Sequence, residues 1–199
     1  MNLETLMGHL AIFFGVLGSW GLYKQARMIW SSKSAESVSG VWVILFLAMF
    51  TAFLIYGTQR GSFPMKFQGW LRVLFSLPVT IGFFKFGNRN WKHVLLLCMC
   101  AVFLSGMSVA MFSPTLFTAF SLLGVWSSFV QAYTIRKNRS RGKVAVELQV
   151  IYLLAILCWF VYASVRMDIP LLIVSVGFTL SYTSTILMWV RYPKSSPST

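Results

Sequence analysis

The sequence contains very little negative charge and few charged residues of any kind. Of 199 residues, 4 are acidic and 17 are basic, so 11% are charged, whereas a soluble domain has about 25%. With 57% hydrophobic residues, this composition excludes a water-soluble globular domain. The formal charge of +13 could suit a nucleic-acid partner, but the basic residues lie in short gaps between apolar runs rather than on a polar face. We therefore expect no nucleic-acid binding.

Groups that bind metals or form disulfides are also scarce. The cysteines, Cys98, Cys100 and Cys158, all fall inside apolar runs, so they form no disulfide framework. Neither His9 nor His93 has a carboxylate or cysteine partner at ligand spacing. The sequence also shows no paired carboxylates, no nucleophile with an adjacent base and no glycine-rich phosphate loop. We expect no metal, no cofactor and no catalytic residues, hence no enzyme.

Long apolar runs take up the chain instead. One crossing of the hydrocarbon core needs about 20 apolar residues, so the chain has room for seven spans with short loops. Prolines at or near the starts of three spans support these boundaries, because the first turn of a helix tolerates a missing N–H. The predicted spans are Leu6–Trp30, Ser39–Gly57, Pro64–Phe86, Trp91–Phe112, Pro114–Arg136, Ala145–Val165 and Asp168–Val190.

The basic residues indicate how these spans are oriented. With seven spans, thirteen of the 17 basic residues fall on one side, and Arg60, Lys66 and Arg166 fall on the other. Cytoplasmic loops carry the excess of Lys and Arg, so we expect an integral membrane protein with its N-terminus outside and its C-terminus cytoplasmic. A short-looped chain of this kind favours the plasma or inner membrane. The run from Arg136 to Lys143 is interpreted as an orientation signal, with lipid headgroup binding as the alternative.

An internal repeat appears at an offset of 106 residues. It superposes fourteen identical residues between Leu10 and Pro64 on the second half of the chain, including Trp20 on Trp126. The predicted organisation is a three-helix repeat in 1–90, a linker transmembrane helix in 91–112, and a second three-helix repeat with a short cytoplasmic tail in 113–199. Such repeats are parallel and typically enclose a site near the bilayer midplane, as in transporters.

Several motifs in the repeats carry a family resemblance. The stretch Tyr23–Ile29, followed by Ser32–Ser39, resembles the PQ-loop repeat of the SWEET and SemiSWEET sugar transporters, and Val130-Gln131 begins the corresponding stretch of the second copy. Cys158–Ala163 resembles the family's L-W-x-x-Y-G motif. The resemblance implies an all-α fold of two parallel three-helix repeats joined by a linker helix. It also implies alternating-access transport of a sugar or other small polar solute. Few membrane acids are present to couple protons, which favours uniport.

The sequence also departs from the family pattern. Lys24 and Val130 replace the proline of Pro-Gln, and the family's pocket asparagines fall at Gly69 and Ser175. Two alternatives therefore stay open. One is a ligand- or peptide-binding receptor resembling the PQ-loop-like KDEL receptors. The other is a vitamin, nucleoside or amino-acid permease with the same arrangement of helices. Homo-oligomerisation is likewise left open.

Arg72 is the most informative candidate binding residue. It lies near the middle of the third span, where a lipid-facing guanidinium would cost at least about 2.5–3.5 kcal/mol, so it should face the protein interior. Gln68 and Ser76 lie four residues before and after it, on the same helix face. A guanidinium can bind a carboxylate through two hydrogen bonds. These three residues predict a binding face for an anionic or carboxylate-bearing solute, with structural pairing of Arg72 as the alternative.

Further candidates come from the second repeat and its matches. Ser175 and Thr179 form the corresponding stripe of the seventh span. The resemblance implies a stacking role for Trp159, and Phe53 occupies its place in the first repeat. Packing or an interfacial position is the alternative for Trp159.

Both repeats also share a pattern at their first helices. Gly18 and Gln25 in one copy match Gly124 and Gln131 in the other, on one face of each helix. We interpret the glutamines as parts of a cytoplasmic gate, and the glycines as hinges in place of the missing prolines. Close helix packing, with glutamine joining helices by hydrogen bonds, is the alternative.

Overall fold

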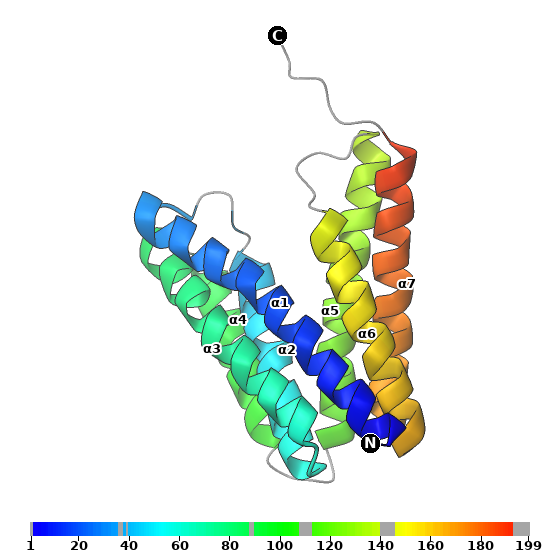
Figure 1. Ribbon diagram of the computed structural model, residues 1–199. Helices are drawn as coiled ribbons and strands as arrows, with labels where there is room; N and C mark the ends of the chain where they lie inside the picture. The colour runs from blue at the N-terminus through cyan, green and yellow to red at the C-terminus, as the bar shows by residue number, and fades with distance from the viewer. Residues whose placement is uncertain are drawn as a thin grey trace. The chain divides into compact units, whose positions relative to one another are not determined.

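The computed structural model describes residues 2–35, 38, 40–87, 90–107, 113–139 and 146–192. All regular structure in these residues is α-helical (Figure 1). The helices are α1 Leu3–Ser32, α2 Gly40–Gln59, α3 Phe63–Phe86, α4 Trp91–Gly106, α5 Ser113–Asn138, α6 Val146–Arg166 and α7 Ile169–Arg191.

Six of these helices are long and apolar enough to cross a membrane, which confirms six of the predicted spans. The exception is α4, an apolar helix of 16 residues. Its predicted span continues to Phe112, but residues 108–112 lie outside the described part of the chain. The crossing by α4 therefore stays a prediction.

Polar side chains begin three of the helices. The Ser62 hydroxyl accepts a hydrogen bond from the backbone N–H of Met65 at the start of α3. The carboxylate of Asp168 accepts one from the N–H of Leu171 at the start of α7. Before α4, Asn90 and His93 satisfy each other's backbone N–H groups. Each capping side chain accepts a hydrogen bond from a backbone N–H that has no partner within its helix.

The 106-residue offset also holds for the backbone. It relates the ends of α1, α2 and α3 to those of α5, α6 and α7 to within one residue wherever both are described. Two pairs of matching positions have a positive φ after a helix end: Lys33 at 50° and Arg139 at 49°, then Gly61 at 61° and Met167 at 52°. The two copies therefore share their turns as well as their helices.

Met167 provides a test of this turn, because a residue with a Cβ pays about 1–2 kcal/mol in the left-handed region and glycine does not. Met167→Gly is expected to raise stability by about 1 kcal/mol in thermal unfolding of the detergent-solubilised protein. Met167→Ala keeps the Cβ and should leave stability unchanged, since the Met167 side chain is exposed. Gly61→Ala should lower stability by a similar amount. A less stable Met167→Gly protein would contradict this account.

The chain forms two compact units. One unit is Gly15–Ser121, and the other combines Met1–Phe14 with Leu122–Thr199. The chain therefore passes between the units within α1 and again within α5. These units describe packing, whereas the assignment of residues 1–90, 91–112 and 113–199 to repeats and linker describes sequence and stays a prediction.

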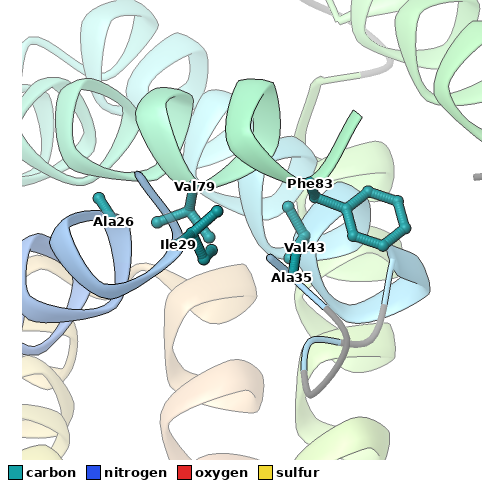
Figure 2. Packing of buried hydrophobic residues seen from close by; sticks show 6 residues of the cluster. All are labelled: Ala26, Ile29, Ala35, Val43, Val79 and Phe83. Carbon is teal, nitrogen blue, oxygen red and sulfur yellow. The ribbon is translucent and has the colours of Figure 1, made fainter. Parts of the chain in front are cut away.

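Within Gly15–Ser121, α2 packs along α3 and also contacts α4. Side chains from α1, α2 and α3, and from the segment after α1, form a hydrophobic cluster near one end of α3 (Figure 2). The Trp30 indole N–H adds a hydrogen bond to the Pro78 carbonyl, at 3.0 Å. The cluster consists of Ala26, Ile29, Ala35, Val43, Val79 and Phe83.

A matching tyrosine–arginine pair lies near the C-terminal ends of α2 and α6. The Tyr56 hydroxyl accepts from Arg60 Nε at 3.0 Å, and the Tyr162 hydroxyl accepts from Arg166 Nη1 at 3.1 Å. Arg166 Nη1 also forms an ion pair with Glu4, at 3.1 Å. These contacts give each of the two arginines a defined partner near the end of its helix.

Candidate functional site

A buried polar stripe runs along α3. Gln68, Arg72 and Ser76 are all buried, and the guanidinium-bearing residue is only 2% exposed. The interior position expected for Arg72 is therefore confirmed. Thr80 continues the stripe by another four residues, is also buried, and donates its hydroxyl to the Ser76 carbonyl at 3.0 Å. Thr80 is not among the residues predicted from the sequence, although the same i+4 spacing places it on this helix face.

The guanidinium of Arg72 lies over an aromatic ring. Its Cζ lies 5.3 Å from the centroid of the Phe50 ring on α2. Phe50 ends a series of aromatic contacts with Phe46 and Trp42, one helical turn apart. A cation over a desolvated aromatic face gains about 2 kcal/mol. Phe50 thus helps to keep a charge inside the helix bundle, and sequence spacing alone did not identify it.

Gln68 lies against the backbone of α1 at Gly15. A Cβ added to Gly15 would collide with the side-chain amide of Gln68, so the close approach depends on glycine. Gln68 Oε1 is buried and has no hydrogen-bond partner among the described residues. Buried polar atoms are nearly always hydrogen-bonded. An acceptor in this state is chemically able to receive a hydrogen bond from a bound polar molecule.

Gly69, next to this stripe, packs against another helix. A Cβ at Gly69 would lie 2.7 Å from both Leu54 Cα and Leu54 N on α2. Backbone atoms cannot yield as the end of a flexible side chain can. The asparagine that the family resemblance places here therefore has no room, and in this chain the position serves helix packing.

The two aromatic candidates contact other aromatic residues. Phe53 lies 5.8 Å from Phe117, which stacks on Tyr56 at 4.4 Å between ring centroids. Trp159 is 3% exposed and meets Tyr162 edge to face, at 5.4 Å. Phe53 is therefore close to an aromatic cluster at the start of α5, and Trp159 is part of the core of its own unit.

The seventh helix carries a smaller polar stripe in the other unit. Ser175 is fully buried, and its Oγ has no hydrogen-bond partner among the described residues. The hydroxyl of Thr179, half-buried, donates to the Ser175 carbonyl at 2.8 Å. The residue that matches Arg72 at the 106-residue offset is Phe178, which stacks on Tyr182. The second copy therefore has no charge at this position.

The predicted gate and hinge residues lie along α1 and α5. Gly18 is buried, whereas Gln25 and Gly124 are half-buried. The Gly124 carbonyl accepts from the hydroxyls of both Ser127, at 2.7 Å, and Ser128, at 3.0 Å. Such hydroxyl contacts to a helix carbonyl often accompany bends. The side chain of Gln131 lies outside the described part of the structure.

Comparison with solved structures identifies the architecture. The chain matches the 3.7 Å structure of a eukaryotic SWEET transporter with a TM-score of 0.82, over 94% of this chain and 95% of that one. The chain has the fold of a SWEET transporter. The two sequences are 14% identical, so the likeness is one of fold. No protein-family model matches the sequence, and no curated protein matches it.

The SWEET-like fold confirms the resemblance noted in the sequence motifs. It also agrees with an all-α integral membrane protein with six apolar helices of spanning length among the described residues. The match covers almost the full length of both chains. The arrangement of three, one and three helices, and the roles of the individual site residues, stay predictions.

Proposed function

We propose that the protein is a SWEET-like transporter that carries a small polar solute across the membrane by alternating access. The buried polar stripe on α3 is the observation that carries this proposal. Charged side chains within membrane spans cost free energy, and they mark functional sites such as substrate pathways. The SWEET-like fold supports it, because the solved structure with this fold is that of a transporter.

The buried guanidinium of Arg72 indicates the chemistry of the solute. It carries five N–H donors in a planar fork that matches a carboxylate. Gln68 offers a carbonyl acceptor without a partner among the described residues, and Ser76 lies four residues further along the helix. We therefore favour an anionic or carboxylate-bearing metabolite that also presents a donor to Gln68, over a neutral sugar.

In the other unit, the buried Ser175 hydroxyl and the neighbouring Thr179 are the proposed polar contacts. Phe53 and Trp159 are retained as candidates for stacking on the apolar part of the solute. Their aromatic contacts would hold the two rings in fixed orientations.

Uniport is proposed because the described carboxylates are poorly placed to couple protons. Glu4 forms an ion pair with Arg166, and Asp168 caps α7. Glu147 is exposed in the first turn of α6. A proton-coupled carrier needs an acid that can change its charge inside the membrane, and none of these three occupies the middle of a span.

The hinges of the proposed cycle are Gly18 and Gly124, with Gln25 and Gln131 at the gate. The division into compact units supports the hinges, because it falls between Phe14 and Gly15 in α1 and between Ser121 and Leu122 in α5, within about one helical turn of Gly18 and Gly124. In the proposed topology the N-terminus lies outside and the C-terminus is cytoplasmic, in a plasma or inner membrane.

Uptake into proteoliposomes tests the proposal. The purified protein should take up one class of solute from a labelled panel of hexoses, amino acids, organic anions and nucleosides. Uptake should be saturable, absent from empty liposomes and unchanged by a proton ionophore. We expect a carboxylate-bearing member to be preferred. Saturable binding of a peptide without uptake of any solute would overturn the transporter proposal in favour of a receptor, and loss of uptake with the ionophore would overturn uniport.

A further inference from the structure

Three arginines surround one hollow at the C-terminal ends of α5 and α7. The hollow has a volume of about 410 Å³, within the 300–1,000 Å³ typical of small-molecule sites. It belongs entirely to one compact unit, and no part of the α3 stripe contributes to it. The described residues that line it are Arg136, Arg139, Met188, Arg191 and Tyr192.

The ends of the two helices hold these arginines in place. Arg139 follows α5 with a positive φ of 49°, and its N–H donates to the Arg136 carbonyl at 3.3 Å. This turn keeps two of the arginines together where α5 ends. On the other side, α7 ends at Arg191, and the Tyr192 N–H closes the helix on the Met188 carbonyl at 3.1 Å. Local backbone structure therefore fixes the positions from which all three guanidiniums extend.

The positive charge of the three arginines is larger than the negative partial charge at the C-terminal ends of α5 and α7. The C-terminus of a helix carries about half a negative charge, so two ends offset about one of the three positive charges. Among the described residues, no carboxylate forms an ion pair with any of these arginines. Two of the acidic residues are engaged elsewhere, Glu4 with Arg166 and Asp168 as the cap of α7. The hollow is therefore strongly electropositive.

The first repeat provides an internal comparison, because the same offset places Trp30, Lys33, Gly82, Lys85 and Phe86 at the five matching positions. In the first repeat, the indole of Trp30 packs at the position that corresponds to the hollow. Lys85 Nζ lies 5.3 Å from the Trp30 ring and 5.2 Å from the Phe86 ring, and the two rings meet edge to face. In the second repeat Arg136 replaces this tryptophan, and an open, charged hollow takes the place of aromatic packing.

We propose that this hollow is a binding site for a phosphate group. A phosphomonoester carries a charge of about −1.5 to −2 at pH 7 and has three acceptor oxygens. Arginine forks pair with such oxygens bidentately, and three of them can bind one phosphate from different sides. The phosphate can belong to a lipid headgroup or to a soluble molecule, and the recognising chemistry is the same. The site is separate from the proposed transport function and does not depend on it.

Binding to the full-length protein tests the proposal with two kinds of probe. Inorganic phosphate is titrated into the detergent-solubilised protein by calorimetry. The protein is also placed in phosphatidylcholine nanodiscs that contain either phosphatidic acid, a monoester, or phosphatidylglycerol, a diester. Native mass spectrometry then measures which lipid stays bound to the protein. We expect Arg136→Gln and Arg191→Gln each to weaken phosphate-group binding at least tenfold. Arg136→Trp, which copies the first repeat, should abolish it.

Lys137→Gln is the matched control, because it removes one positive charge from the same exposed turn without touching the hollow. It should change binding by less than twofold. Binding of free phosphate without preference for phosphatidic acid supports a soluble ligand, and preferential retention of phosphatidic acid supports a lipid ligand. If no probe binds, or if Lys137→Gln weakens binding as much as Arg136→Gln, the site does not exist as proposed.

Discussion

Replacing Arg72 by leucine is expected to reduce substrate binding and saturable uptake at least tenfold, and to leave the protein folded. A charge-assisted hydrogen bond contributes about 1.5–3 kcal/mol, so one lost contact corresponds to roughly a tenfold to hundredfold change in affinity. Leucine places an apolar side chain at this buried position next to Phe50. Replacement of a buried charge by a well-packed apolar residue is often neutral for stability. Initial uptake rates in proteoliposomes, normalised to folded protein, measure the effect.

Two further variants separate chemistry from structure. Arg72→Lys keeps the charge but loses the planar fork, so it should restore little of the uptake if a carboxylate is bound bidentately. Arg60→Leu removes another guanidinium that also lies over an aromatic ring, that of Tyr56, and should leave uptake within twofold. Normal uptake by the Arg72→Leu protein would refute the proposed role. So would a loss of uptake fully explained by a lower unfolding temperature.

Gly69→Ala is expected to lower the stability of the protein by about 1–3 kcal/mol, the cost typical of overpacking in a well-packed interior. The added Cβ would lie 2.7 Å from two backbone atoms of Leu54, so α2 and α3 would have to move apart. These two helices pack along each other in the unit Gly15–Ser121. Denaturant or thermal unfolding in detergent measures the loss. Gly69→Leu should fail to accumulate as folded protein.

Gly106→Ala is the matched control for this prediction. A Cβ at Gly106 would lie 3.4 Å from Leu116 Cδ1, at the edge of ordinary contact and against a movable methyl group. Its effect should stay within about 0.5 kcal/mol, as for most substitutions that break no specific feature. Equal losses at Gly69 and Gly106 would show that any added methyl group on these helices is harmful, and would contradict a specific contact at Gly69.

Much of the fold could be predicted from the sequence, because a bilayer imposes simple rules on a chain. Each span must be helical and about 20 residues long, since backbone polar groups find no water in the hydrocarbon core. The apolar runs therefore predicted seven spans, and six of them are helices of spanning length among the described residues. The repeat matched the helix ends to within one residue, and it brought out the PQ-loop motifs whose fold the SWEET structure confirms.

The candidate site was only partly predictable. The burial of Gln68, Arg72 and Ser76 followed from spacing along one helix face and from the cost of a charge in lipid. Periodicity could not show that Phe50 faces Arg72, because the two residues lie on different helices. Neither could it show that Trp159 is buried in a core.

The sequence by itself determined that this is a membrane protein of repeated helices, and that one arginine lies buried within a span. Only the tertiary structure decided that Gly69 has no room for a side chain, and that Arg136 borders an open hollow where its counterpart Trp30 is packed against its neighbours. The physical reason is that hydrophobic spacing and charge depend on residues close along the chain. The space around a side chain depends on helices that are distant in sequence, and that space is set only when they pack.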